Sequence, residues 1–145
     1  MKKILFILIF ISTALFANSK IDYRTAKIYK DDISSKMAFS MQQEGALLID
    51  VRTKPEFNHL RSKGSINIPI FYAKNGQRVF NRNFLNEIYQ VSNKNINRKI
   101  ILICRSGSRT KLASNLLAEQ GFSNVYNVTQ GFQYDWIKEK LPTEK

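Results

Sequence analysis

Cys104 carries the most reactive side chain in this sequence of 145 residues, and it is the chain's only cysteine. It opens the hexapeptide Cys104-Arg-Ser-Gly-Ser-Arg109. Gly107 can take a positive φ, so the loop can curl with successive N–H groups pointing inward as an anion cradle. Arg105 and Arg109 add positive charge, which favours a thiolate over a thiol. The spacing therefore predicts an exposed, ionised sulfur nucleophile that needs no histidine to remove its proton.

The competing interpretation of Cys104 is a small hydrophobic side chain packed at a strand end. Burial of that kind would strand the charges of the flanking arginines, so the sequence favours the reactive cysteine. One cysteine and one histidine also exclude a disulfide framework and a zinc site built from several such ligands. A serine hydrolase would depend on His59 alone. We predict no metal and no cofactor.

Two apolar runs, residues 46–51 and 99–104, predict strands that are buried on both faces. The second run ends at Cys104, and residues 110–120 then predict a helix that is closed by Gly121. In open parallel sheets, ligands bind in the crevice at the carboxyl ends of the strands. The start of the helix adds the positive end of its dipole. The Cys104 loop therefore lies where an anion site is expected.

Apolar spacing and turn residues predict the remaining elements. We expect helices over 32–44, from Lys54-Pro55, over 84–91 and over 132–140, strands over 65–69 and 125–128, and a loop over 71–81 that turns at Asn75-Gly76. Asp32 is the expected N-cap of the first helix, and Gly45 its C′ residue. Strands that alternate with helices predict an α/β fold with a central, mainly parallel sheet and helices on both faces.

Residues 1–17 have the pattern of a secretory signal peptide: two lysines, a nearly continuous apolar stretch and small residues after it. We expect cleavage after Ala17, a polar lead-in over 18–30 and one domain over 31–145. The mature protein would be periplasmic or secreted, without stable membrane insertion. The stretch is short for a bilayer span, which takes roughly 20 residues. An uncleaved membrane anchor is the alternative.

The net charge of +12 comes from 23 lysines and arginines against 11 aspartates and glutamates. These cations are scattered along the chain, without a long basic run and without a zinc-finger or RNA-binding motif. The pattern indicates a solvated basic surface that attracts small anions. We expect no nucleic-acid partner.

Four segments of the chain are considered together: Leu47-Leu-Ile-Asp-Val-Arg52-Thr-Lys-Pro-Glu-Phe57, Lys63-Gly-Ser-Ile-Asn-Ile-Pro69, Cys104-Arg-Ser-Gly-Ser-Arg109 and Val125-Tyr-Asn-Val-Thr-Gln-Gly131-Phe-Gln-Tyr-Asp-Trp136. Together they resemble a single-domain rhodanese, a sulfurtransferase. The resemblance implies a rhodanese-like α/β fold. It also implies that Cys104 takes a sulfane sulfur from a small anionic donor of thiosulfate or polysulfide type. The persulfide so formed would pass its sulfur to a thiol, to cyanide or to a protein acceptor.

The resemblance assigns donor binding and persulfide stabilisation to the amides and cations that follow the nucleophile: Arg105, Ser106, Gly107, Ser108 and Arg109. Asp50 and Arg52, at the neighbouring strand end, would support the loop, with Asp50 bracing its backbone amides or Arg109. A plain strand-end cap is the alternative for Asp50. His59 is offset by two positions from the histidine common in the family, so we assign it no role. We expect a monomer.

The length of the loop separates two chemistries. Four residues lie between Cys104 and Arg109. Related domains that act on phosphate or arsenate have a similar loop with five residues between the cysteine and the arginine. The tighter loop favours sulfur transfer over phosphatase or arsenate reductase activity. A non-catalytic module that only carries or binds sulfur through the same persulfide is the second alternative. Such a carrier would load one sulfur per chain but turn over poorly.

Overall fold

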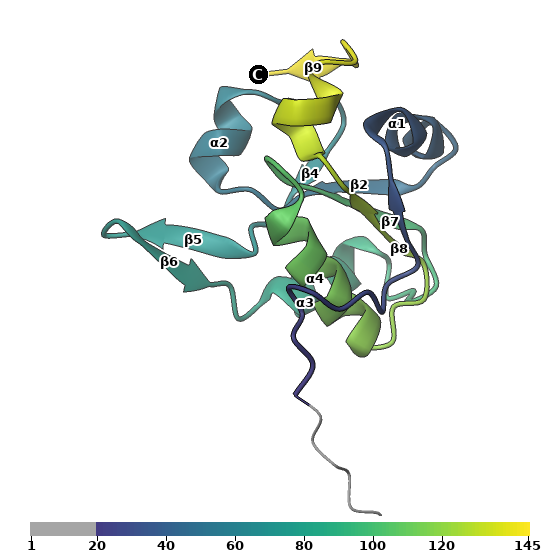
Figure 1. Cartoon of the computed structure of the whole chain (residues 1–145), viewed down its shortest axis with the longest axis vertical. Coiled ribbons are helices and arrows are strands. Elements are labelled where there is room, and N and C mark those ends of the chain that lie inside the picture. The colour runs from purple at the N-terminus through teal and green to yellow at the C-terminus, as the bar shows by residue number, and fades with distance from the viewer. Residues whose placement is uncertain (1–19) are drawn as a thin grey trace, which may run out of the picture.

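A computed structural model describes residues 20–145, which form a five-stranded parallel sheet with helices on both faces (Figure 1). The strands lie in the order β1-β8-β7-β2-β4, and every neighbouring pair is parallel. Their bounds are β1 Asp31–Ile33, β2 Leu47–Asp50, β4 Ile66–Asn67, β7 Ile100–Ile103 and β8 Val125–Val128. The predicted α/β class with a mainly parallel central sheet is confirmed. The proposed signal peptide lies outside the described residues.

The helical elements are α1 Ser35–Gln43, α2 Lys54–His59, α3 Phe84–Val91, α4 Ser108–Glu119 and the π-helical turn η1 Phe132–Trp136. The central strand β7 is fully buried because it separates two cores. Alternate side chains of a strand point to opposite faces. Ile100 and Leu102 accordingly pack with α3 and α4, whereas Ile101 and Ile103 pack with α1 and η1. This double burial explains the continuous apolar run in the sequence.

The chain before α1 makes contacts with both β8 and α4. Residues 31–33 pair with β8 as strand β1, and α1 starts only at Ser35, with Ser34 as its N-cap. The prediction that Asp32 caps this helix was therefore wrong, because strand pairing satisfies the backbone there instead. Further upstream, the Asn115 side chain donates to the backbone oxygens of residues 23 and 26 and accepts from the N–H of residue 28.

A β-hairpin replaces the loop predicted over residues 71–81. Strands β5 Phe71–Lys74 and β6 Gln77–Phe80 pair antiparallel around Asn75 and Gly76, whose φ angles are 52° and 74°. Positive φ at both central residues is the geometry of the tight hairpin turn that Asn-Gly favours. The expected turn position is thus confirmed, but the strands on either side of it were missed. The hairpin projects from the side of the domain (Figure 1).

The C-terminal segment returns to the body of the domain after η1. The predicted helix over 132–140 is shortened to the π-helical turn, and β9 Thr143–Glu144 then pairs antiparallel with β3 Arg61–Ser62. Trp136 is fully buried, as expected for core packing, and its Nε1 donates to the Pro142 oxygen at 3.0 Å. Within residues 20–145, no helix has the length and apolar character of a membrane span.

Candidate active site at Cys104

Cys104 lies at the carboxyl end of β7, beside the end of β2 and in front of the first turn of α4. Gly107 is the N-cap of α4 and takes the left-handed conformation, with φ 93°. The helix begins at Ser108, two residues earlier than the apolar pattern indicates. The predicted sequence of buried strand, loop with a positive-φ glycine and helix start is therefore present.

The Cys104 side chain belongs to the hydrophobic core on the α3 and α4 side of the sheet, and its sulfur also meets polar groups of its own loop. The Gly107 N–H donates to Sγ at 3.1 Å, and the Thr110 Oγ1 lies 3.5 Å from Sγ. Thr110 Oγ1 also lies 2.9 Å from the Gly107 carbonyl oxygen, to which it can donate. Cys104 has 0% exposed surface, so the expectation of an exposed nucleophile was wrong. The reason is geometric: the curled loop that directs an amide at the sulfur also covers it.

Several amides of the loop remain available to an outside anion. The N–H groups of the first helical turn have no intrahelical acceptor. Within residues 20–145, the backbone N–H groups of Ser106, Ser108 and Arg109 have no hydrogen-bond acceptor. The side chains of Arg105, Ser106 and Ser108 are exposed, which places this part of the loop at the surface. The loop thus has one amide directed at the sulfur and others free beside it.

Gly107 and Gly131 allow two segments of backbone to approach each other closely. A Cβ placed on Gly107 would lie 1.8 Å from the Thr129 carbonyl oxygen, and one on Gly131 would lie 2.5 Å from the Cys104 carbonyl oxygen. The Phe132 N–H donates to that same Cys104 oxygen at 2.7 Å. The turn between β8 and η1 therefore holds the loop in place. Gly131, which comes between the strand ending at Val128 and the element starting at Phe132, could have indicated this contact, but we assigned it no role.

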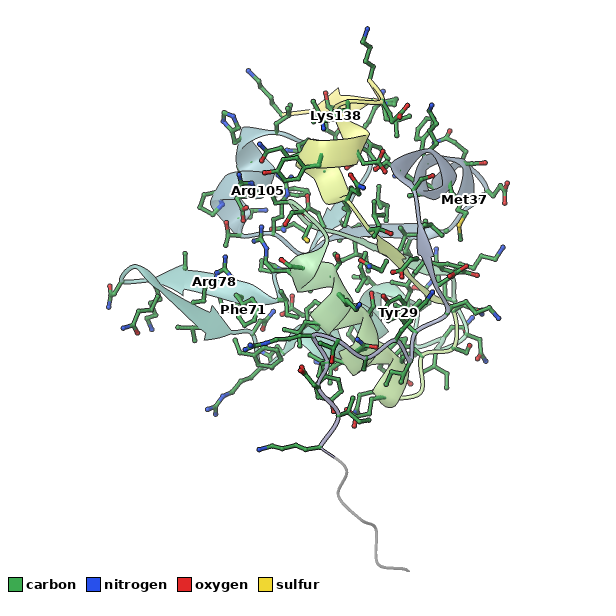
Figure 2. The ribbon with its side chains drawn as sticks, in the orientation of Figure 1. Tyr29, Met37, Phe71, Arg78, Arg105 and Lys138 are labelled. Carbon is green, nitrogen blue, oxygen red and sulfur yellow. The ribbon has the colours of Figure 1, made fainter. Side chains whose placement is uncertain are left out.

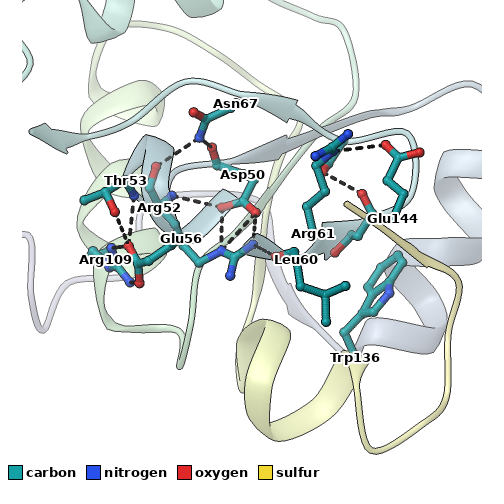
Figure 3. Close-up of polar contacts among 12 residues, drawn as sticks. Asp50, Arg52, Thr53, Glu56, Leu60, Arg61, Asn67, Arg109, Trp136 and Glu144 are labelled. Atoms are coloured by element: carbon teal, nitrogen blue, oxygen red, sulfur yellow. Dashed lines mark hydrogen bonds and ion pairs between the residues drawn. The ribbon is translucent and has the colours of Figure 1, made fainter. Parts of the chain in front are cut away.

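Arg109 is held by a carboxylate that the sequence analysis did not single out. Its two terminal nitrogens donate to the two carboxylate oxygens of Glu56, each at 2.8 Å (Figure 3). Thr53, the N-cap of α2, also donates to Glu56 through its N–H and its hydroxyl. A threonine followed three residues later by glutamate is a capping-box pattern, which is the signal that could have marked Glu56.

The ion pair fixes the charge of both partners. Burial alone would raise the pKa of Glu56, but hydrogen bonds from Arg109 and Thr53 outweigh it and lower the pKa to about 2. Hydrogen bonding to Glu56 raises the pKa of Arg109, so the guanidinium remains charged. The side chain of Arg109 is 11% exposed and that of Glu56 is 32% exposed. Arg109 is therefore a fixed positive charge beside the loop.

Asp50 binds Arg52 and not the Cys104 loop. Its carboxylate accepts from the N–H, Nε and Nη2 of Arg52, and both side chains are buried (Figure 3). The expectation that Asp50 braces the loop amides or Arg109 was wrong, because Arg52 folds back and occupies the carboxylate. The Arg52 guanidinium stacks over the Phe132 ring at 4.4 Å. Since Phe132 donates to the Cys104 oxygen, Arg52 supports the loop through that residue.

Arg105 is the loop's accessible cation. Its Nε donates to Gln133 Oε1 at 2.6 Å, and within residues 20–145 it has no acidic partner. With Ser106 and Ser108, it lines a surface cavity of about 370 Å³ that reaches to Arg78 on β6. Figure 2 labels both arginines, Arg105 in the loop before α4 and Arg78 on the hairpin. This opening over the loop is therefore positively charged, and it suits a small anion. His59 is exposed and makes no hydrogen bond to these loop residues within the described part of the chain.

Comparisons with known proteins agree with this architecture. Residues 35–138 match the model of the rhodanese-like domain. The chain is 33% identical over 123 residues to the Rickettsia prowazekii protein RP600, covering 77% of this chain and 94% of that protein. It is 30% identical over 115 residues to the thiosulfate sulfurtransferase GlpE of Glaesserella parasuis, and the match covers 78% of this chain and 92% of that protein.

Solved structures show the same fold. The crystal structure of Rv0390 from M. tuberculosis matches with a TM-score of 0.66 and 26% identity, covering 80% of this chain and 98% of that one. An E. coli rhodanese solved with anions matches with a TM-score of 0.52 and 21% identity, and the match covers 70% of this chain and 99% of that one. From the matched domain, the two relatives and the parallel sheet that carries the Cys104 loop, we conclude that this chain belongs to the rhodanese-like domain family.

Proposed function

We propose that the protein is a sulfurtransferase that carries sulfur on Cys104 as a persulfide. The observation that carries this proposal is the position of Sγ at the carboxyl end of β7, with the Gly107 N–H donating to it at 3.1 Å. A hydrogen bond from an amide stabilises a charged sulfur over a neutral one. The free amides of Ser106 and Ser108 lie at the same loop. They can bind the oxygens of an anionic donor such as thiosulfate.

The first half of the reaction loads the sulfur. The Cys104 thiolate attacks the outer sulfur of thiosulfate, the sulfur–sulfur bond of the donor breaks, and sulfite leaves with the bonding electrons. In the second half, an acceptor such as cyanide attacks the outer sulfur of the persulfide and leaves as thiocyanate. The electrons of the broken bond return to Cys104. Because Sγ has no exposed surface, the loop must open slightly to admit the donor's outer sulfur.

The cations have different parts in this proposal. Arg105 is exposed and draws the donor to the loop. Arg109 is bound at both terminal nitrogens by Glu56, so it contributes a fixed positive field and not a mobile ligand. Because both terminal nitrogens of Arg109 already donate to Glu56, they are not available to bind the oxygens of a tetrahedral phosphate or arsenate. This supports sulfur transfer over the related oxyanion chemistries.

The test compares three proteins with thiosulfate and cyanide. The natural chain should gain the mass of one sulfur atom and release thiocyanate repeatedly, and Cys104→Ser should do neither. The matched control is Cys104→Ser combined with Ser123→Cys, which keeps one cysteine per chain but places it in the exposed turn before β8. It should also be inactive. Equal thiocyanate release by Cys104→Ser would refute the proposal, and loading without repeated release would identify a carrier.

We further propose, from the sequence pattern alone, that the protein is exported and cut after Ala17, and that it acts as a monomer in the periplasm or outside the cell. Mass spectrometry of the protein recovered from its native host would show a first residue at position 18. A chain that retains Met1 or its neighbours in the membrane fraction would support the uncleaved anchor instead. Sedimentation of the purified protein would test the monomer.

A further inference from the structure

A groove runs between the hairpin and the start of α4. It consists of two adjoining cavities of about 370 and 300 Å³, which share Arg78 and the first two residues of α4. The first cavity is the opening over the Cys104 loop. The second, the far cavity, continues along α4 to Lys111 and to Arg24 of the amino-terminal segment. Because the groove continues past the loop, it offers more cationic surface than one small donor can cover.

The cations of the groove have no acidic partners. Four of them form no ion pair within residues 20–145: Arg24, Arg78, Arg105 and Lys111. Glu56, the carboxylate in the lining, already binds Arg109. Residues 57–86 and 88–118, which supply the hairpin, the loop and most of α4, contain no acidic side chain at all. Like charges held close together favour the binding of an anion among them, so the groove suits a polyanion.

Apolar side chains lie among these charges. Phe71 and Leu112 line the far cavity and are half-buried. Phe80 pairs with Phe71 across the hairpin, with ring centroids 6.1 Å apart, and is 41% exposed. Figure 2 labels Phe71 and Arg78 on the hairpin beside α4. An inorganic polyanion gains nothing from aromatic and aliphatic walls, whereas an apolar side chain gains free energy when it leaves water. The lining therefore indicates a ligand with both negative and apolar groups.

The hairpin also presents backbone groups to an extended chain. Strands β5 and β6 pair only with each other, so within residues 20–145 each strand keeps one edge without a partner. A free strand edge binds an extended peptide through backbone N–H and C=O groups. These edges favour a polypeptide over a nucleic acid as the polyanion.

We propose that this basic groove docks an extended acidic segment of a partner protein, one that carries aromatic or aliphatic side chains among its glutamates or aspartates. The carboxylates of the segment meet Arg78, Lys111 and Arg24, and its apolar side chains pack on Phe71 and Leu112. The inference goes beyond the proposed function, because docking requires no sulfur on the protein.

Fluorescence anisotropy with defined probes tests the chemistry of the occupant. The protein is Cys104→Ser, which forms no persulfide, and the probe is the labelled peptide Glu-Phe-Glu-Glu-Val-Glu-Phe-Glu. A peptide with glutamine for every glutamate should bind at least about tenfold more weakly, and one with serine for every apolar residue at least about fivefold more weakly. Single-stranded DNA of equal charge should also bind at least about fivefold more weakly. Any of these three probes binding as tightly as the first would overturn the proposal.

Paired variants place the binding site. Arg24 and Lys111 line the far cavity and not the opening over the loop, so Arg24→Gln with Lys111→Gln removes only the far charges. We expect this pair to weaken the acidic peptide about fivefold or more. Lys94→Gln with Lys99→Gln is the matched control, since both lysines are exposed, form no ion pair within the described residues and lie before β7.

The control pair should change the affinity by less than about twofold, because charges beyond about 8 Å are largely screened at physiological salt. Both pairs should keep the melting temperature of the parent protein, since surface substitutions have small effects on stability. Equal losses of affinity in the two pairs, or no loss in either, would overturn the proposal.

The outcomes separate docking from sulfur transfer. Thiocyanate release by the natural chain is measured independently of peptide binding. Sulfur transfer without any preference for the acidic peptide refutes the docking groove alone. A clear preference for the acidic peptide, lost in Arg24→Gln with Lys111→Gln, supports the groove even where no sulfur is transferred.

Discussion

Replacement of Glu56 by glutamine removes the charge that fixes Arg109 but keeps an oxygen for the Thr53 cap. The pKa of Glu56 is lowered from 4.5 to about 2 in the folded protein. At about 1.36 kcal/mol per pKa unit, a shift of this size corresponds to at most about 3 kcal/mol of stability. The carboxylate is 32% exposed, so solvent screening reduces the expected loss to about 1–2 kcal/mol at neutral pH.

The pH dependence of this loss identifies its cause. A carboxyl group whose pKa is lower in the folded than in the unfolded state stabilises the fold above its unfolded pKa, and that contribution disappears as the pH falls through the folded value. For Glu56 these limits are 4.5 and about 2. Urea unfolding should therefore show the full difference between the natural protein and Glu56→Gln near pH 7. The difference should shrink steadily below pH about 4.5.

A control substitution makes the result decisive. Glu44, at the C-cap of α1, is exposed and has no ion pair within residues 20–145, so Glu44→Gln should change stability by less than about 0.5 kcal/mol at any pH. In a melting experiment, Glu56→Gln should lower the transition by about 3–8 °C at pH 7. A loss for Glu56→Gln that is the same at pH 7 as near pH 2.5, or no greater than the loss for Glu44→Gln, would contradict the role given to the ion pair.

Two further predictions concern the loop and the strand end beside it. Gly107→Ala should displace the loop, since the added Cβ would lie 1.8 Å from the Thr129 oxygen at a positive φ; we expect thiocyanate release to fall by about 100-fold or more, and an unchanged rate would show that the amide at the sulfur is dispensable. Asp50→Asn leaves the buried charge of Arg52 unpaired and should cost about 3–5 kcal/mol in urea unfolding. Adding Arg52→Met should recover much of that loss, and a double variant as unstable as Asp50→Asn would argue against the charge as its cause.

Local patterns in the sequence were sufficient to predict the framework of the site. Buried strands and helix ends are local features, and the apolar run before Cys104, the positive φ of Gly107 and the helix behind it are all present in the structure. The tight turn at Asn75-Gly76 was also predicted from two residues. The flanking strands β5 and β6 were missed because their side chains are largely exposed and give no apolar pattern.

Contacts between distant segments could not be read from local patterns. Glu56 meets Arg109 across 53 positions, and nothing in either neighbourhood identifies the partner. Asp50 was expected to reach the loop, yet Arg52 lies nearer along the same strand end and satisfies it. The burial of Cys104 likewise depends on how closely its own loop and the turn at Gly131 pack. Such distances are set by tertiary packing and not by residue type.

The anchoring of residues 20–30 on α4 gives the domain a definite orientation. Tyr23 hydrogen-bonds to Glu119 at the last turn of α4, whereas Cys104 lies before the first turn, and a helix of this length is about 17 Å long. The chain therefore enters the domain at the end opposite the sulfur (Figure 1). If a surface or a partner held the protein by its amino-terminal side, the Cys104 loop would face away from it and would stay accessible to molecules in solution.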